Sequence, residues 1–458
     1  MTALADRRAG VVATRLAGTD GVSLETAKWA TVLGRLGVRC FYFAGQLDRP
    51  PEVSRLVPEA FFRHPDIDAI SRVVFIEAVE IEPASGATTR ADGSQAEEPP
   101  GARIRRRDFF SPYVRPPALS RRIEELKVHL KEELYEFVRE FDLDLLIVEN
   151  ALAIPLNIPL ALALTDLIAE TGIPVIAHHH DLPWERQRFA VNSVGDYIAA
   201  AFPPALPSVR HAVINSVQAQ QLAWRRGLTS RVIPNVMDFD TPPAPPDDYA
   251  RNARRDLGVD DGKAFILQPT RIIQRKGIEH AIELVRRLCV PATLVVSHAG
   301  GEEDDDYQQR VREFAHLLDV PVRFESDIVG HERGTTPDGR RIYALSDVYP
   351  QADLVTYPSS IEGFGNAFLE AVYYRRPIVL NRYSVFEVDI EPKGFRVVGF
   401  DNYISAATIR DACRLLQDRA LAAEWAELNY GLAARHFSYE VLERRLMALL
   451  SECLGEER

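Results

Sequence analysis

The sequence predicts an α/β protein with two domains, each built around a parallel sheet. Apolar runs of strand length alternate with helical patterns along the chain, as in parallel sheets joined by crossover helices. A proline-rich segment at 233–246 separates two such series, and this proline density is incompatible with regular structure. At 458 residues the chain is long enough for two to three domains with substantial cores.

The first series begins with a strand at 9–14, a turn at 16–22 and a helix that ends at Gly37. Ser23 is expected to cap this helix, with Glu25 two positions later. Further strands are expected at 38–44, 73–76, 143–148, 174–177 and 212–214. The most apolar segment, 151–169, contains prolines and an aspartate, and therefore predicts a buried loop and helix, not a membrane span.

The second series follows the proline-rich segment. Strands are expected at 264–268, 292–297, 322–325, 354–357 and 378–381. Helices are expected at 278–288, 305–318 and 366–374, with several more between 404 and 455. The sequence therefore predicts a first domain at 1–235 and a second at 236–435.

Composition limits the classes of function. The net charge of −12 argues against bulk nucleic-acid binding. The four cysteines, Cys40, Cys289, Cys413 and Cys453, lie far apart in sequence and form no Cys-x-x-Cys pair. Neither a cysteine metal site nor a disulfide is expected. Arg15 interrupts the short apolar run near the N-terminus, so no signal peptide is predicted, and a cytoplasmic location is expected.

The segment 83–117 differs from its surroundings, being rich in proline, glycine, alanine, threonine and charge, with four arginines between 103 and 107. It is interpreted either as a mobile surface loop or as a lid near an anionic or sugar acceptor. Both interpretations stay open.

The segment 359–371 carries the strongest functional signal. Two carboxylates, Glu362 and Glu370, flank a glycine-containing turn into a helix. Gly363 and Gly365 let the backbone approach a ligand, and the helix start at Asn366 offers unpaired N–H groups to a phosphate. Glu370 lies about 6 Å further along the helix, at about 1.5 Å per residue. This arrangement suits a nucleotide sugar; the alternative is an ordinary turn with two solvated glutamates.

Two cations follow the strand at 264–268. Arg271 and Lys276 lie on a short loop before a helix, where fixed positive charges suit a diphosphate leaving group. Negative charge grows on that group as the glycosidic bond breaks, so the cations would stabilise the transition state more than the ground state. The alternative is a solvated basic loop. Arg275, their neighbour, is expected at the surface.

In the first domain, Asp20 and Gly21 open the first helix, whose amides would face a phosphate or an acceptor. The alternative is a tight turn without a ligand. Later, three histidines at 178–180 end a strand, and alternation places only His178 and His180 on one side. No carboxylate spacing typical of zinc enzymes accompanies them, so no metal is expected. Asn150, after the strand at 143–148, would bind an acceptor or simply cap a loop.

The Pro-Ser-x-x-Glu-Gly-Phe-Gly turn, which includes Phe364, and its Glu-x7-Glu spacing resemble family 4 of the retaining glycosyltransferases, the glycogen-synthase-like group. The resemblance covers nearly the whole chain. It implies the glycosyltransferase B (GT-B) fold, in which two Rossmann-like domains face a cleft and a terminal helix, here 436–458, packs back on the first domain. It also implies that Glu362 contacts the transferred sugar, that Glu370 contacts the ribose, and that Arg271 and Lys276 clamp the diphosphate.

The resemblance further implies a histidine beside the transferred sugar. His180 is the preferred match, although His178 or His179 would also fit. Donor binding is expected of Gly21 and of the turn and helix start Gly363, Phe364, Gly365 and Asn366. Acceptor binding is expected of Asp20, Asn150, His178 and Asp181.

The expected activity is retaining transfer of a hexose, glucose or mannose, from a nucleotide diphosphate sugar to a hydroxyl of a small-molecule or glycan acceptor (EC 2.4.1-like). In the family the departing phosphate accepts the acceptor's proton, and no metal or other cofactor is expected. The long 83–117 segment and the His-rich strand end also resemble enzymes that make mannosyl- or glucosyl-glycerate solutes. The alternatives are a sugar phosphorylase or nucleotide-sugar epimerase of the same fold, or a catalytically silent nucleotide-sugar binder.

Overall fold

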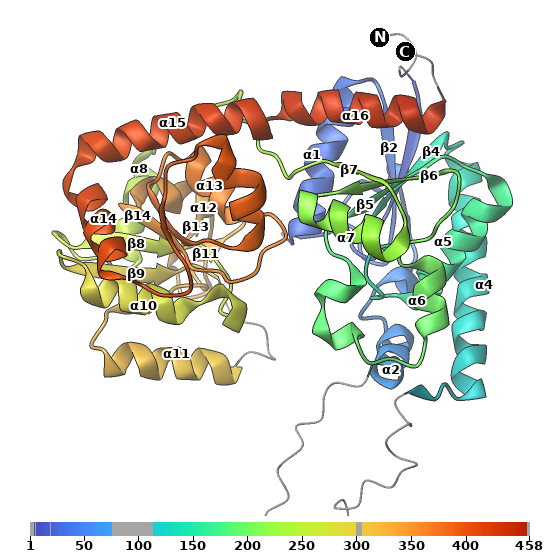
Figure 1. Cartoon of the computed structure of the whole chain (residues 1–458), viewed down its shortest axis with the longest axis horizontal. Helices are drawn as coiled ribbons and strands as arrows, with labels where there is room; N and C mark the ends of the chain where they lie inside the picture. The colour runs from blue at the N-terminus through green and yellow to red at the C-terminus, as the bar shows by residue number, and fades with distance from the viewer. Residues whose placement is uncertain (1–3, 5, 19, 76–112, 299–304, 456–458) are drawn as a thin grey trace, which may run out of the picture. The chain divides into compact units, whose positions relative to one another are not determined.

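The computed structural model describes residues 4, 6–18, 20–75, 113–298 and 305–455 (Figure 1). The chain divides into two compact units. The first comprises residues 1–212, 226–231 and 448–458, and the second comprises 213–225 and 232–447. Most of the segment 83–117 lies outside the described residues.

The first unit contains a seven-stranded sheet in the order β3-β2-β1-β4-β5-β6-β7. Its strands are β1 (Arg8–Val12), β2 (Arg39–Ala44), β3 (Ser54–Leu56), β4 (Leu145–Glu149), β5 (Val175–His179), β6 (Val209–Val213) and β7 (Ser230–Val232). β1 pairs in parallel with both β2 and β4, so the strand order reverses at β1. Open α/β sheets bind their ligands at the carboxyl ends of the strands beside such a reversal. The residues that follow β1, β4 and β5 are therefore well placed to form a site.

The helices of the first unit are α1 (Gly21–Arg35), α2 (Pro65–Val74), α4 (Pro117–Glu140), α5 (Ile158–Thr171) and α6 (Gly195–Ala201), and α4 and α5 lie side by side (Figure 1). The strand expected at 73–76 is wrong over the residues that the structure describes, because Val73 and Val74 end helix α2 and Phe75 forms only an isolated bridge with Asn192. Ile67, Ile70 and Val74 recur at helical spacing and are buried on one face. The first two residues of the apolar run that suggested a strand thus belong to the last turn of an amphipathic helix.

Helix α1 is capped by Asp20 and not by Ser23. The Asp20 Oδ1 atom accepts hydrogen bonds from the amides of Val22 (3.1 Å) and Ser23 (3.2 Å). The expected buried loop and helix at 151–169 is confirmed as α5, with Asn157 as its cap. Among the described residues, no helix is long and apolar enough to cross a membrane.

The second unit contains a six-stranded parallel sheet in the order β10-β9-β8-β14-β15-β16. Its strands are β8 (Ala264–Gln268), β9 (Ala292–Val296), β10 (Val322–Phe324), β14 (Leu354–Tyr357), β15 (Ile378–Asn381) and β16 (Val398–Phe400). The five expected strands are confirmed within a residue of their ends. The order reverses between β8 and β14, so the loops after these two strands mark the second candidate site.

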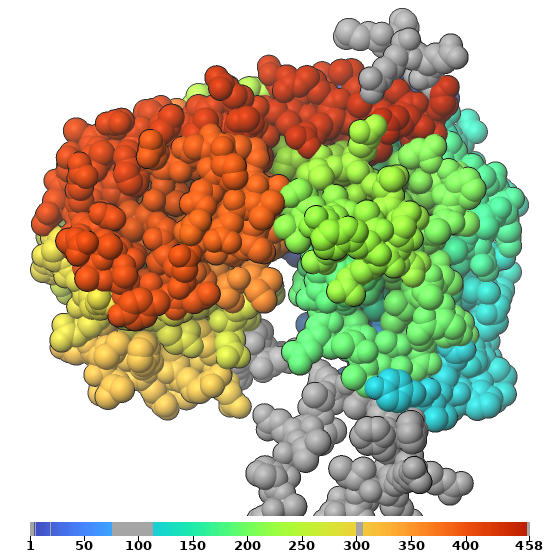
Figure 2. Space-filling model, in the orientation of Figure 1, coloured from blue at the N-terminus to red at the C-terminus, as the bar shows by residue number. Residues whose placement is uncertain are grey.

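Helices cover both faces of this sheet. They are α10 (Ile278–Arg287), α11 (Asp305–Leu317), α13 (Asn366–Tyr373), α14 (Ala406–Gln417) and α15 (Arg419–Phe437), with the shorter α8 (Asp248–Arg251), α9 (Ala253–Asp256) and α12 (Leu345–Val348). Leu267 and Val355 belong to one buried cluster, and Ile266 and Leu354 belong to another. Alternate residues of each strand are thus buried on opposite faces, as a parallel sheet requires. In Figure 2 the orange and red chain from α13 onward forms the upper part of the surface of this unit on the viewed side, and the yellow chain forms the lower part.

Two further helices and a small sheet belong to the described chain. Helices α7 (Ser216–Arg226) and α16 (Tyr439–Leu454) each include residues of both units. A small sheet of β11 (Val329–Gly330), β13 (Arg341–Ala344) and β12 (Gly334–Thr335) was not expected from the sequence.

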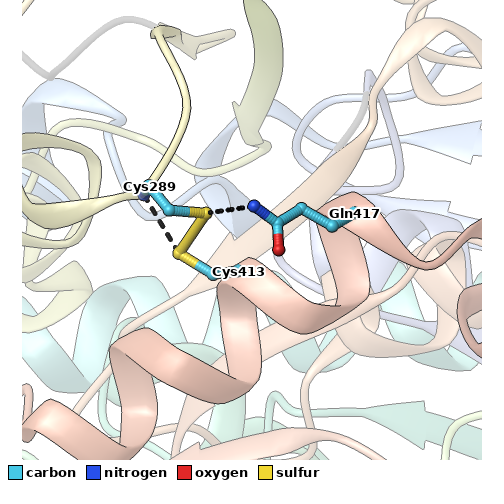
Figure 3. The surroundings of a disulfide bond; sticks show 3 residues. All are labelled: Cys289, Cys413 and Gln417. Atoms are coloured by element: carbon cyan, nitrogen blue, oxygen red, sulfur yellow. Dashed lines mark hydrogen bonds between the residues drawn. A yellow bond between two sulfur atoms is a disulfide. The ribbon is translucent and has the colours of Figure 1, made fainter.

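A disulfide joins Cys289 and Cys413, which corrects the expectation that the cysteines stay unpaired. Cys289 follows α10 and Cys413 lies in α14, and their Cα atoms are 5.8 Å apart. Figure 3 shows the Cys289 amide, which donates to Cys413 Sγ, and the side-chain amide of Gln417, which donates to Cys289 Sγ. The two cysteines are 124 residues apart in sequence, a separation that carries no information about their distance in the fold.

Candidate active site

A buried ion pair lies at the carboxyl ends of β8 and β14 in the second unit. The Lys276 ammonium group donates a hydrogen bond to Glu362 Oε1. Arg275 donates to Glu362 Oε2 (3.3 Å) and to the carbonyl oxygen of Ile361 (2.9 Å). Arg275, which was expected at the surface, has a side chain that is 35% exposed, and it also joins the loop after β8 to the loop after β14.

Gly277 allows these two loops to approach each other. Its φ angle is 61°, and a Cβ atom there would lie 2.6 Å from the carbonyl oxygen of Pro358. A side chain at position 277 would therefore be strained by its backbone conformation and would push the loops apart. A pocket of about 730 Å³ opens beside this contact. It is lined by Ile273, Gln274, Arg275, Gly277, Glu279, His280, Pro358 and Ser360.

The pair is charged although it is buried. Burial disfavours the charge on Glu362, yet Lys276 and Arg275 hold the pKa of this carboxyl below its usual range. Burial lowers the pKa of Lys276, and the neighbouring Glu362 offsets part of that effect. Because removing charges from water costs several kcal/mol per ion, a buried pair adds little to stability. Such groups are more typical of functional sites.

Positive charge exceeds negative charge around Glu362. Arg271 is exposed, and it is near enough for its charge to disfavour the charge on Lys276. Two cations, Arg275 and Lys276, thus contact one carboxylate, and a third, Arg271, lies near Lys276. This arrangement favours a ligand that carries at least two negative charges.

The turn 363–366 is held from several sides. Gly365 has a φ angle of 114°, and a Cβ atom there would lie 2.3 Å from the Tyr383 hydroxyl oxygen. That hydroxyl donates to the carbonyl oxygen of Phe364 (2.7 Å), and the side-chain amide of Asn215 donates to that of Gly363 (2.7 Å). The sequence did not indicate Asn215 or Tyr383, because both lie far from the turn along the chain.

Glu370 lies on α13, where a tyrosine orients it. The Tyr349 hydroxyl donates to Glu370 Oε2 (2.7 Å), and the fully buried Tyr349 ring stacks on Tyr374. Burial raises the pKa of Tyr349, and the adjacent Glu370 raises it further, so the phenol stays protonated and keeps donating. The carboxylate is thereby held in one orientation, and its expected contact with a ribose stays a prediction.

In the first unit, Glu149 and two histidines form a buried cluster at the ends of β4 and β5. Glu149 Oε2 lies 2.9 Å from His178 Nδ1 and 3.0 Å from His180 Nε2. His178 is fully buried and stacks on Trp29 of α1, with ring centroids 4.1 Å apart. The expectation that His178 and His180 share a side of the strand is confirmed.

Glu149, His178 and His180 also form a group that is able to hold a metal ion, since their candidate ligand atoms lie within 4.8 Å of one another. The hydrogen bonds already account for the short contacts. Burial opposes the charge of Glu149, but the two histidines bring its pKa to about 2. The carboxylate is therefore ionised at neutral pH, and each histidine supplies an N–H group to it.

His179 points to the other face of β5. Its Nε2 atom lies 3.0 Å from Nδ1 of His211 on β6, and both rings are buried. Burial lowers the pKa of both histidines, that of His211 to about 4. These two rings are therefore neutral at pH 7. His179 is thus buried against β6, and the assignment of His180 to a substrate site stays a prediction.

The residues expected to bind the acceptor have defined contacts. Asn150 has a φ angle of 59°, and its Oδ1 atom accepts from the amides of His180 (3.0 Å) and Asp181 (3.3 Å). Asp181 pairs with Arg186 at 2.8 Å. Asp20 caps α1 and pairs with Arg15 at 3.2 Å, so its carboxylate already lies at the helix start beside Gly21. Roles of these residues in acceptor or donor binding stay predictions.

Comparison with known proteins identifies the family. No protein-family model matches the chain. A mannosylglucosylglycerate synthase from Thermotoga maritima is 31% identical over 455 residues, covering 93% of this chain and 95% of that protein. A second, from Petrotoga mobilis, is 30% identical over 414 residues, covering 85% of each chain. The chain belongs to this family of glycosyltransferases.

Solved structures agree with this assignment at the level of the fold. A glycosyltransferase from Rickettsia africae covers 99% of the chain, and the chain covers all of it, with a TM-score of 0.63 and 15% identity. The Anabaena protein Alr3699/HepE, solved with UDP and glucose, has a TM-score of 0.59 and 14% identity, with 97% of this chain and 100% of that chain covered. The GT-B fold with two Rossmann-like domains and the glycosyltransferase class are both confirmed.

Proposed function

We propose that this glycosyltransferase transfers a hexose, with retention of configuration, from a nucleoside diphosphate sugar to a hydroxyl of a small acceptor that carries a carboxylate. Mannose is the proposed sugar and glucosylglycerate the proposed acceptor, because two relatives at 30–31% identity are mannosylglucosylglycerate synthases. The Anabaena structure with UDP and glucose supports a nucleotide sugar as the donor class.

One observation carries the proposal for the donor site: Arg275 and Lys276 contact Glu362 at the ends of β8 and β14, and Arg271 adds a third positive charge near Lys276. In the proposed complex, Arg271 and Lys276 bind the diphosphate and the start of α13 offers its N–H groups to it. Glu362 accepts a hydrogen bond from a hydroxyl of the transferred sugar, and Glu370 accepts hydrogen bonds from the ribose hydroxyls. Arg275 keeps Glu362 oriented while Lys276 contacts the phosphate.

The chemical step then needs little from the protein except charge and position. As the bond between the anomeric carbon and the phosphate oxygen breaks, Arg271 and Lys276 stabilise the growing negative charge. The departing phosphate accepts the proton of the acceptor hydroxyl on the same face of the sugar, so no protein base is required. His180 is proposed to contact the transferred sugar and to stabilise positive charge at its anomeric carbon.

A matrix of donors and acceptors tests this proposal. GDP-, UDP- and ADP-linked mannose and glucose are each incubated with glycerate, glucosylglycerate or glucose, and NMR records the product and its anomeric configuration. The expected result is an α-linked mannosyl product with glucosylglycerate and little product with glucose. Inverted product contradicts the proposed stereochemistry. Phosphorolysis or epimerised donor without transfer supports a phosphorylase or epimerase, and binding without turnover supports a silent binder.

A further inference from the structure

Glu149 is a buried carboxylate, and burying its charge costs free energy. It ends β4, is 1% exposed, and pairs in parallel register with His178 of β5. Its Oε2 atom contacts both His178 and His180, and its Oε1 atom has no hydrogen-bond partner among the described residues. A charge buried in this way is stable only if its neighbours donate to it. The two rings are those donors.

This geometry fixes the proton on each ring. His178 must present Nδ1–H to Glu149, and His180 must present Nε2–H to the same oxygen. The two contacts are almost equal in length, but the two rings differ in setting. His178 is fully buried against Trp29, whereas His180 is 7% exposed and is the member nearer the surface. His178 therefore supports the carboxylate, and His180 is the ring that a ligand can reach.

The backbone of His180 is held from the same strand end. Asn150, the residue after Glu149, accepts hydrogen bonds from the amides of His180 and Asp181 through Oδ1. The left-handed backbone of Asn150 directs this side chain toward the end of β5. Glu149, the last residue of β4, thus fixes the ring of His180, and Asn150, which follows β4, fixes its main chain.

We propose that Glu149 is a positioning residue that holds the His180 imidazole in one orientation and one tautomer for glycosyl transfer. The inference rests on the proposed function, since it assumes that His180 contacts the transferred sugar. Glu149 itself touches no substrate. It acts through His180, much as a buried carboxylate orients a histidine in other enzymes.

Other charged groups also face the pair. Glu25 of α1 is fully buried and pairs with Lys28 (2.9 Å), and Asp181 follows His180. Burial lowers the pKa of His180, but Glu149, Glu25 and Asp181 more than offset this, so the net pKa is raised. Removing the Glu149 charge leaves burial opposed only by the more distant acids. The pKa of His180 should therefore fall.

The test compares Glu149→Gln and Glu149→Asp with the wild-type enzyme. Glu149→Gln keeps the side-chain volume and removes the charge, so we expect kcat to fall about 10- to 100-fold with the donor KM within twofold. NMR titration of labelled histidine should show a lower His180 pKa, and the kcat–pH profile should shift to lower pH. Glu149→Asp keeps the charge, so its kcat and its His180 pKa should lie between those of Glu149→Gln and those of the wild type. His211→Asn, which disturbs the other face of β5, is the control and should leave the profile unchanged.

Each outcome decides a different point. Unchanged kcat and His180 pKa in Glu149→Gln overturn the positioning role. If His180→Ala also leaves transfer unchanged, the role proposed for His180 fails first. Loss of transfer in His180→Ala but not in Glu149→Gln refutes the positioning role alone. Metal at one equivalent in the purified wild type, lost in Glu149→Gln, also overturns it, because the three side chains then act as ligands. If Glu149→Gln does not fold, kcat and the NMR titration of His180 in Glu149→Asp test the positioning role instead, and wild-type values of both overturn it.

Discussion

Replacing Lys276 with alanine removes one cation from a buried carboxylate and one proposed phosphate contact. The side chains of Lys276 and Glu362 are 11% and 9% exposed. Removing one partner of a fully buried pair costs about 3–5 kcal/mol of folding free energy. Arg275 remains 3.3 Å from Glu362 and is itself 35% exposed, so part of the charge stays compensated. We therefore expect a smaller loss, about 1–3 kcal/mol.

The effect on catalysis should be larger than the effect on folding. Loss of a fixed group that stabilises transition-state charge typically lowers kcat by about 10²–10³-fold, or about 2.7–4 kcal/mol. Transfer is measured as nucleoside diphosphate released with saturating donor and acceptor, and stability by urea unfolding. Lys263→Ala is the matched control, because Lys263 is a lysine of the same unit whose only described ion pair is with the exposed Asp260.

A second variant separates the two effects. Lys276→Ala combined with Glu362→Ala removes both charges, so the folding free energy should recover relative to Lys276→Ala alone. Transfer should not recover. Transfer at the wild-type rate in Lys276→Ala would refute the assignment of this lysine to the leaving group. Stability that falls further in the double variant would refute the electrostatic account of the pair.

Three further predictions follow from the fold. Gly365→Ala should weaken donor binding and lower Tm by several degrees, because the φ angle of Gly365 is 114° and a Cβ atom there would meet Tyr383. The control Gly431→Ala in α15 meets no atom within 4 Å, so it should leave donor binding unchanged and should not lower Tm. Thermal unfolding from pH 7 to pH 4 should show lost stability. His211 has a folded pKa of about 4 against 6.5 unfolded, so the unfolded state binds the proton first and up to about 3 kcal/mol disappears as pH falls through that window. His211→Asn should reduce the dependence of stability on pH between pH 7 and pH 4. An unchanged pH dependence in this variant would contradict its assignment to His211. Cys413→Ser should lower the free energy of unfolding by about 2–4 kcal/mol under oxidising conditions and make it insensitive to reductant, whereas Cys453→Ser should keep the reductant sensitivity.

Local patterns predicted most of the second sheet. The strands β8, β14 and β15 are short apolar runs with clear ends, and their residues are buried on both faces. The run at 73–76 misled because β-branched residues at a helix end resemble a strand when only four residues are considered. The helical spacing of Ile67, Ile70 and Val74 was the signal that could have corrected it.

Some residues of the candidate site were predictable from local sequence patterns, and others were not. Lys276 and Glu362 lie in motifs at strand ends, so the sequence indicated both, and the fold brings them into contact. Asn215, Tyr383 and Tyr349 act on the turn and on Glu370 from distant parts of the chain, where no local pattern marks them. The disulfide was missed for the same reason, since it depends on how α14 packs near the end of α10.

The contact between Lys276 and Glu362 also has a consequence for selectivity among anions. Before a donor binds, the Glu362 carboxylate forms ion pairs with Lys276 and Arg275. An incoming anion therefore has to displace Glu362 from these two cations. Inorganic phosphate would pair with the cations but would leave the Glu362 carboxylate buried without a partner, and an unpaired buried charge costs free energy. A nucleotide sugar brings phosphates for the cations and hydroxyls for the carboxylate at once. The proposed donor site would therefore discriminate against inorganic phosphate, and against its own nucleotide product once the sugar has left.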